Sequence, residues 1–169
     1  KGTDHAVLQA RPLLEGQSDL VVVTYADMPL LGAETLRRLV ERQRENAGPL
    51  TILTLVHDDP RGFGRVIRDA SGAVREIVEE AVATPEQLAV RELNAGVYCF
   101  AAGWLWSHID RIPLSMPKRE YYLTDMVGMA GAEGERVEAV VTQDAGEVLG
   151  IKTRVHFAEG KVGLGRMIN

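Results

Sequence analysis

The chain has 169 residues, of which 46% are hydrophobic and 25% are charged, a composition typical of one folded domain in water. Its net charge of -5 argues against a nucleic-acid-binding protein, and no apolar run reaches the ~20 residues that a membrane span needs. The single cysteine, Cys99, excludes an internal disulfide framework. Because Cys99 lies in an apolar run, we expect it in the core of a cytoplasmic protein rather than at a reactive site.

The first predicted element is a helix over residues 3–10, for which Thr3 is a suitable N-terminal cap. Gly2 and Thr3 could also present backbone N–H groups to a ligand at the start of this helix. On pattern alone, a simply capped helix is the favoured interpretation.

Residues 20–30 form the most informative stretch, a β-branched run that leads to a carboxylate and a proline. A run this apolar predicts a central strand buried on both faces, as in a parallel sheet, and Pro29 ends it. Asp27 then lies at the carboxyl end of the strand, where open α/β sheets bind their ligands. It either holds a divalent cation shared with substrate phosphates or caps the helix that follows.

The rest of the chain alternates helical and extended patterns, which predicts an α/β fold with parallel crossovers. Helices are predicted at 32–46, 83–88, 102–109, 121–133 and 154–169, and strands at 50–57, 64–68, 74–79, 91–100 and 137–142. Thr84 followed by Pro85 is a clear helix start. Asn94 enters an otherwise apolar strand, so it either bonds to neighbouring backbone or contacts a ligand.

The order of short motifs along the chain resembles a known family. The motifs are Gly2-Thr3-x-His5-Ala6, Tyr25-Ala26-Asp27-Met28-Pro29-Leu30, Gly62-Phe63-Gly64-Arg65, Ile77-Val78-Glu79, Glu92-Leu93-Asn94-Ala95-Gly96, Glu120-Tyr121-Tyr122-Leu123-Thr124-Asp125 and Gly150-Ile151-Lys152-Thr153-Arg154. Together they resemble the uridyltransferase domain of the bacterial bifunctional N-acetylglucosamine-1-phosphate uridyltransferase/glucosamine-1-phosphate acetyltransferases. The resemblance runs over essentially the whole chain and implies a Rossmann-like three-layer sandwich with a mostly parallel central sheet.

The resemblance implies attack of N-acetylglucosamine 1-phosphate on the α-phosphate of UTP, which gives UDP-N-acetylglucosamine and pyrophosphate with Mg²⁺ present. Gly2 and Thr3 would then contact the uridine, Tyr25 and Ala26 would lie beside the nucleotide, and Asp27 would be the catalytic residue that holds Mg²⁺. The implied sugar-binding residues are Gly64, Glu79 and Asn94, with Tyr122 and Thr124 at the sugar-phosphate end. Metal-assisted transfer of this kind depends on positioning and charge neutralisation more than on a strong base.

The chain also departs from the family pattern. The family's Gly-rich phosphate loop, first strands and left-handed β-helix acetyltransferase domain are missing, so residues 1–153 are interpreted as the C-terminal two-thirds of a nucleotidyltransferase domain. Residues 154–169 would begin the linker helix. Ala26 replaces the usual Gly, and Lys152 replaces the Asn that usually shares the metal. A lysine cannot ligate Mg²⁺, so Lys152 either contacts phosphate or weakens the metal site.

Two alternatives to a uridyltransferase remain from the sequence. The chain could be a non-catalytic sugar-nucleotide-binding or oligomerising module, or a related transferase that uses glucose 1-phosphate. Without the phosphate loop, we expect the isolated chain to be inactive. The edge left beside residues 20–23 also predicts a homo-oligomer, because an exposed apolar strand tends to pair with another chain.

Overall fold

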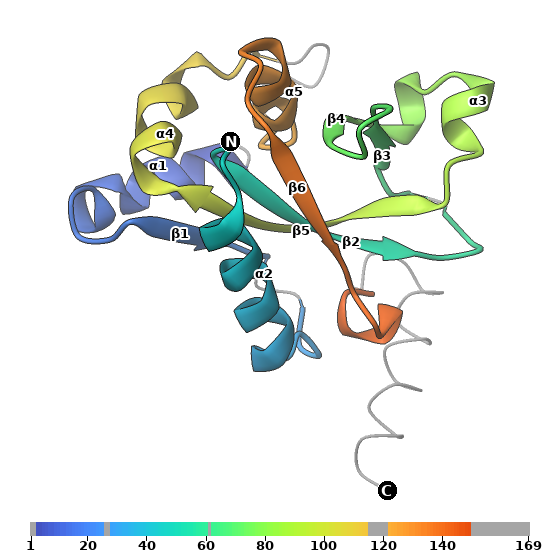
Figure 1. Cartoon of the computed structure of the whole chain (residues 1–169), viewed down its shortest axis with the longest axis horizontal. Coiled ribbons are helices and arrows are strands. Elements are labelled where there is room, and N and C mark those ends of the chain that lie inside the picture. Colours follow the sequence, from blue (N-terminus) through green and yellow to red (C-terminus); the bar gives the residue numbers. More distant parts are fainter. Residues whose placement is uncertain (1–2, 26–27, 61, 115–121, 150–169) are drawn as a thin grey trace, which may run out of the picture.

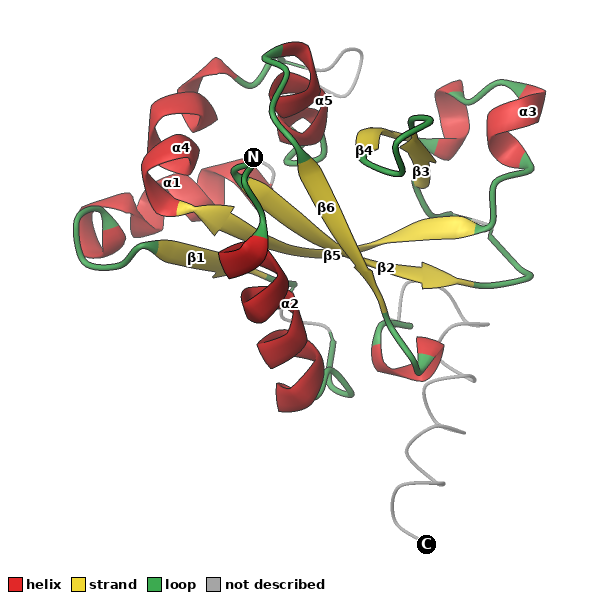
Figure 2. Ribbon diagram, in the orientation of Figure 1, coloured by secondary structure: helices red, strands yellow, loops and turns green. Residues whose placement is uncertain are grey.

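The computed structural model describes residues 3–25, 28–60, 62–114 and 122–149 as an open mixed sheet with helices on both faces (Figures 1 and 2). The helices are α1 (Thr3–Leu14), α2 (Ala33–Glu45), α3 (Pro85–Leu88), α4 (Ala102–His108) and α5 (Asp125–Ala132), with single 3-10 turns η1 (Glu80–Val82), η2 (Ile109–Arg111) and η3 (Ala145–Glu147). The strands are β1 (Leu20–Val23), β2 (Leu50–Val56), β3 (Arg65–Arg68), β4 (Val74–Val78), β5 (Glu92–Ala101) and β6 (Val137–Val141). Within these ranges, no helix is long and apolar enough to traverse a bilayer.

The longest strand, β5, holds the sheet together. It pairs antiparallel with β2 along one side, and with β1 and the start of β3 along the other. The remaining ladders join β2 to β6 in parallel and β3 to β4 in an antiparallel hairpin. Strands β1, β2, β3 and β6 therefore point one way and β4 and β5 the other, which agrees with the predicted α/β class and makes the sheet mixed.

The structure corrects the prediction that residues 20–23 form a strand buried on both faces. Among the described strands β1 pairs only with β5, and Val22 is 39% exposed whereas Val21 is 7% exposed. The apolar run reflects packing of one face and antiparallel pairing to β5, rather than a position inside a parallel ladder. Strands β1 and β2 do run in the same direction, as the predicted crossover requires, with β5 between them.

Two apolar clusters cover opposite faces of the sheet. One contains α1, α4 and α5 packed over residues such as Ile52, Tyr98 and Phe100. The other joins α2 to the opposite side of β2 and β5, and includes the free thiol of Cys99. Cys99 is fully buried, which confirms the expected place in the core, and this burial raises the pKa of its thiol to about 11.

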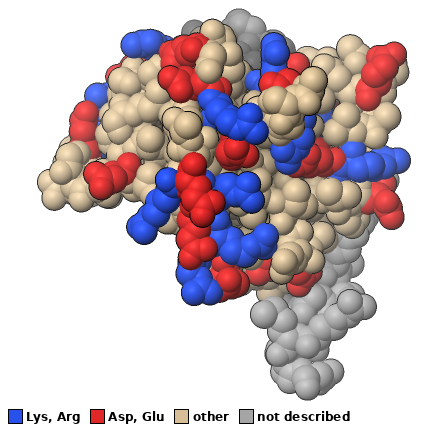
Figure 3. Space-filling view, in the orientation of Figure 1, with Lys and Arg blue, Asp and Glu red and all other residues tan. Residues whose placement is uncertain are grey.

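Helix α2 has the amphipathic pattern expected from the sequence. Leu39 and Gln43 are buried, and acidic and basic side chains are interspersed over its outer surface (Figure 3). The helix ends at Glu45 with Asn46 as its C-cap, and the next turn brings Gly48 against the backbone of Arg136. Gly48 is held there because its N–H donates to Asn46 Oδ1 (2.8 Å) and its carbonyl accepts from Gln43 Nε2 (2.9 Å).

Helix α1 is longer than its sequence predicts. It continues from residue 10 to Leu14 although Pro12 has no N–H to donate. Pro12 removes one intrahelical hydrogen bond, the one that the carbonyl of Leu8 would accept. The C-terminal part of the helix is exposed to water, so the cost of this loss is small.

A side-chain cluster links the ends of α4 and α5 and gives a pH prediction. Trp104 Nε1 donates to Glu133 (3.2 Å), and His108 Nε2 lies 2.6 Å from the same carboxylate. These two hydrogen bonds hold the pKa of Glu133 below its ordinary value, and the bond from Trp104 makes the larger contribution. Since the folded pKa is the lower one, the bonds stabilise the fold above the unfolded pKa, and this stabilisation is lost as the pH falls through the folded pKa.

The measurement is urea unfolding of the wild type and Glu133→Gln from pH 7 to pH 3. The wild type is expected to lose its advantage over the variant on acidification, because a glutamine does not titrate. A difference between the two proteins that stays constant over this range would contradict the assignment.

Candidate functional site

A cavity of about 150 Å³ lies where the loop before β3, the start of β5 and the segment before α5 meet. Its lining residues are Tyr25, Gly62, Phe63, Gly64, Glu79, Asn94, Gly96, Tyr122, Leu123 and Thr124. The chain therefore brings together side chains from segments up to about a hundred residues apart in sequence. Most of the exposed lining is polar, which suits a hydroxylated ligand better than an apolar one.

The cavity collects most of the site residues expected from the sequence. Tyr25, Gly64, Glu79, Asn94, Tyr122 and Thr124 all line it. Gly2, Ala26, Asp27 and Lys152 lie outside the described residues, as does the segment 154–169, and of Thr3 only the place at the start of α1 is described. Within the described ranges, no group of three or more His, Cys, Asp and Glu side chains is arranged to hold a metal ion.

A buried arginine, Arg65, holds the loop at residues 62–64 in place through hydrogen bonds. Arg65 is 2% exposed, and its guanidinium donates to the carbonyl of Phe63 and to Glu80 Oε2 (3.1 Å). The same carboxylate oxygen accepts the backbone N–H of Gly62 (3.0 Å), where φ is +78°. At Gly64 an added Cβ would lie 2.8 Å from Ile77 and 3.5 Å from a carboxylate oxygen of Glu79, so a side chain would crowd the pocket wall.

We expect Glu80→Ala to lower the free energy of unfolding by about 2 kcal/mol. Breaking a buried pair costs roughly 3–5 kcal/mol, and the 41% exposure of the Glu80 side chain reduces this. Among the described residues, Nε of Arg65 has no partner, and in the variant the Phe63 carbonyl is the one acceptor that remains for the guanidinium within this part of the chain. Urea unfolding measures the change.

The matched control is Glu34→Ala, which removes a surface pair with Arg37 in which both side chains are 64% exposed. Its loss should cost less than about 0.5 kcal/mol. Equal effects of the two substitutions would show that Arg65 does not depend on Glu80.

Asn94 is positioned by an irregularity in β5. Leu53 pairs with Val97 but the next residue, Thr54, pairs with Asn94, so Ala95 and Gly96 form a bulge without partners on β2. Gly96 has φ of +77°, and a Cβ there would overlap the ring of Tyr25. Only glycine gives both the left-handed backbone and the room for the Tyr25 ring.

The sequence left two alternatives open for Asn94, a bond to neighbouring backbone or contact with a ligand. Its backbone N–H donates to the carbonyl of Gly64 (2.9 Å), and its side chain bonds to the N–H of Gly96 and the hydroxyl of Tyr98, each at 3.0 Å. The same side chain lines the cavity. Bonding to local protein groups therefore holds Asn94 at the cavity wall.

Tyr98 and Glu80 support the site and were not expected from the sequence. Burial, followed by the proximity of Tyr25 and Glu79, raises the pKa of Tyr98 well above its ordinary value. Its hydroxyl therefore stays protonated in neutral solution. The sequence signal for Tyr98 is weak, because an aromatic residue inside an apolar strand is ordinarily a core residue.

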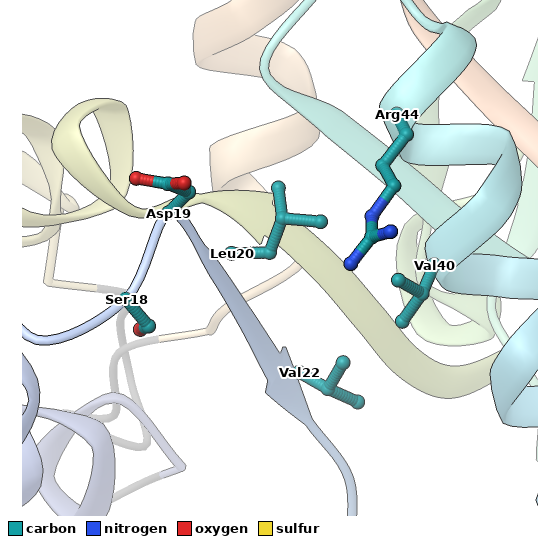
Figure 4. Close-up of a pocket in the computed structure, with 6 residues that line it drawn as sticks. All are labelled: Ser18, Asp19, Leu20, Val22, Val40 and Arg44. Carbon is teal, nitrogen blue, oxygen red and sulfur yellow. The ribbon is translucent and has the colours of Figure 1, made fainter.

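A second, larger cavity of about 480 Å³ lies between β1 and α2. Figure 4 shows Leu20 and Val22 projecting from β1 toward Val40 and Arg44 of α2. Of the expected site residues that the structure describes, none lines it. Its size alone is not a reason to assign it a ligand, and the convergence of polar groups favours the smaller cavity as the functional site.

Comparison with known proteins gives a consistent result. Residues 1–148 match the family described as "Nucleotidyl transferase". The chain is 47% identical over 159 residues to the "Bifunctional protein GlmU" of Solibacter usitatus, which covers 94% of this chain and 34% of that protein. Against the protein of the same name from Trichlorobacter lovleyi, identity is 42% over 168 residues, covering 99% and 36%. The chain thus spans about a third of the length of the curated relatives it matches.

Solved structures of low sequence identity share the fold. A CMP:2-keto-3-deoxy-manno-octonic acid synthetase complexed with CTP superimposes with a TM-score of 0.71 at 14% identity, covering 98% of this chain and 68% of that one. A 4-diphosphocytidyl-2C-methyl-D-erythritol synthase from Anaerococcus prevotii gives 0.60 at 16% identity, covering 95% and 66%. These likenesses establish the fold.

Proposed function

Since this chain belongs to the nucleotidyl transferase family, we propose that it carries the sugar-phosphate site of a uridyltransferase. The reaction joins N-acetylglucosamine 1-phosphate to UTP, and gives UDP-N-acetylglucosamine and pyrophosphate. The observation that carries the proposal is the cavity in which Glu79 and Asn94, from separate strand ends, meet Tyr122 and Thr124. Two proteins named GlmU, at 47% and 42% identity to this chain, also support the proposal.

In this proposal each pocket residue has one task. The carboxylate of Glu79 accepts hydrogen bonds from sugar hydroxyls, and the amide of Asn94 both donates and accepts. Gly64 lets the sugar approach the backbone, since a side chain there would collide with the wall. Tyr122 and Thr124 hold the phosphate end, Tyr25 and Ala26 lie beside the nucleotide, and Gly2 with Thr3 reads the uracil through backbone groups.

Members of this family generally use a divalent metal ion, and we propose that here it is Mg²⁺ held by Asp27. When bound, the ion would neutralise charge that develops on the phosphates. A carboxylate after an apolar strand is a suitable donor for this hard cation. The ammonium of Lys152 cannot be a ligand, so its role would be to contact phosphate. The chain's own residues orient the attacking sugar phosphate.

The test is pyrophosphate release from UTP and N-acetylglucosamine 1-phosphate with Mg²⁺, measured for the gene product that contains these residues and for the 169-residue chain alone. We expect turnover in the first and none in the second. Glucose 1-phosphate replaces the sugar phosphate in a parallel assay. Equal turnover of both sugars would favour the related transferase, and no turnover of either by the gene product would favour a non-catalytic module.

We also propose that the chain self-associates through the free edge of β1 in the cytoplasm. Among the described strands β1 pairs on one side only, and its Val22 is 39% exposed. Unpaired strand edges with apolar side chains pair readily with another copy. Sedimentation of the chain as a monomer at high micromolar concentration would exclude this association.

A further inference from the structure

The bulge in β5 creates a contact that a regular strand would not allow. Residues four apart on a regular strand are separated by about 13 Å. Here Asn94 pairs with Thr54 and Tyr98 with Ile52, so the two stand only two ladder steps apart, roughly 7 Å, on the same face of the sheet. This spacing allows the direct bond of 3.0 Å between Asn94 Nδ2 and the Tyr98 hydroxyl.

The two bonds of the Asn94 side chain fix which way its amide points. The backbone N–H of Gly96 can only donate, so the atom it meets at 3.0 Å must be the oxygen, Oδ1. Nδ2 therefore faces Tyr98, whose hydroxyl oxygen accepts from it. One N–H and one lone pair of the amide are left unused by these bonds, in a residue that lines the cavity.

We propose that Tyr98 is a positioning residue that sets the orientation of the Asn94 amide for recognition of a sugar hydroxyl or acetamido group. This inference rests on the proposed function. Tyr98 is fully buried and does not line the cavity, so it acts only through Asn94. A group that both donates and accepts, as a hydroxyl or an acetamide does, matches one N–H and one lone pair held side by side.

The surroundings of Tyr98 keep this arrangement rigid. Its ring packs against Phe100 with centroids 5.9 Å apart and belongs to the apolar cluster that also contains Leu123 of the cavity lining. The hydroxyl stays protonated because burial disfavours its charged form. It therefore accepts from Asn94 as an uncharged hydroxyl.

The test compares Tyr98→Phe, Asn94→Ala and the double variant in the gene product that contains this chain. Tyr98→Phe removes one oxygen and keeps the packing. We expect its KM for N-acetylglucosamine 1-phosphate to rise about five- to tenfold, the size of one orienting hydrogen bond. The KM for UTP and kcat should stay within twofold. In the Asn94→Ala background, Tyr98→Phe should cause no further change, since its effect passes through the amide.

The matched control is Thr51→Val, which removes another buried hydroxyl from the sheet. Thr51 Oγ1 donates to Gln43 (2.7 Å) and does not line the cavity. We expect this variant to lose stability by a comparable amount without a change in the KM for the sugar phosphate. An equal rise in KM in both hydroxyl-deleted variants would overturn the proposal, because the effect would then be one of stability.

Other outcomes separate this inference from the proposed function. If Asn94→Ala raises the KM for the sugar phosphate and Tyr98→Phe leaves it unchanged, the positioning role is wrong and the sugar site stands. If Asn94→Ala changes nothing, the proposed sugar site itself is wrong. Should Tyr98→Phe fail to fold, nuclear Overhauser contacts between the Asn94 Nδ2 protons and the Tyr98 ring in the unchanged protein decide the matter, and their absence overturns the inference.

Discussion

In the proposed uridyltransferase, Glu79→Ala is expected to lower kcat/KM for N-acetylglucosamine 1-phosphate about 100-fold, or roughly 3 kcal/mol, while the KM for UTP stays unchanged. A carboxylate that accepts from sugar hydroxyls forms charge-assisted bonds, each worth roughly 1.5–3 kcal/mol. Glu79 lines the cavity beside Asn94, and a glycine at position 64 keeps the space next to its carboxylate open. Initial-rate kinetics with each substrate varied in turn measure the effect.

Two further variants sharpen this prediction. Glu79→Gln keeps the shape but loses the charge, so it should cost about tenfold. Glu76→Ala removes an exposed glutamate of β4, the strand that ends just before Glu79, and this residue does not line the cavity, so the kinetics should stay unchanged. Equal kinetics for Glu79→Ala and Glu76→Ala would exclude Glu79 from the sugar site.

Gly48→Ala is expected to lower the free energy of unfolding by about 3 kcal/mol. A Cβ at Gly48 would overlap the carbonyl oxygen of Arg136, with the carbonyl carbon at 2.6 Å and the amide nitrogen at 2.8 Å. These are backbone atoms, so no side chain can rotate away. The turn cannot move freely either, because both backbone groups of Gly48 are bonded to side chains of Gln43 and Asn46.

The control for this prediction is Gly128→Ala in α5. A Cβ there meets nothing within 4 Å, and alanine favours a helix interior by about 0.5–1 kcal/mol. Thermal unfolding of the two variants should move in opposite directions, with a fall of roughly 6–12 °C for Gly48→Ala. A melting temperature within 2 °C of the wild type would show that β6 shifts to admit the methyl group.

Features set by local chemistry were predictable from the sequence. Thr84 and Pro85 start α3, and Thr84 and Gln87 form the reciprocal capping bonds that such a start favours. The apolar face of α2 and the hairpin of β3 and β4 also follow the expected patterns, because hydrophobic periodicity and turn residues act over a few positions.

Features set by distant partners were harder to predict. The apolar run at residues 20–23 is as typical of an interior parallel strand as of the antiparallel strand observed. Its partner, β5, lies about 80 residues away in the sequence, so no local pattern distinguishes the two. Glu79, Asn94 and Thr124 line one cavity. Only the family resemblance predicted that they share a site, because no local sequence pattern relates them. The hydrogen bond between Asn94 and Tyr98 could not be predicted, because a regular strand would place the two residues far apart. Gly96 is the only sequence signal of the bulge that brings them together.

The central place of β5 also has a consequence for how the protein forms during synthesis. Val56 pairs with Glu92 and Val23 with Tyr98, so β2 cannot begin to pair with β5 before residue 92 has left the ribosome, nor β1 before residue 98. Contacts of such long sequence separation slow the search for the native state and leave apolar segments uncovered in the meantime. The apolar residues of β1 and β2 therefore wait for β5 before this sheet can cover them.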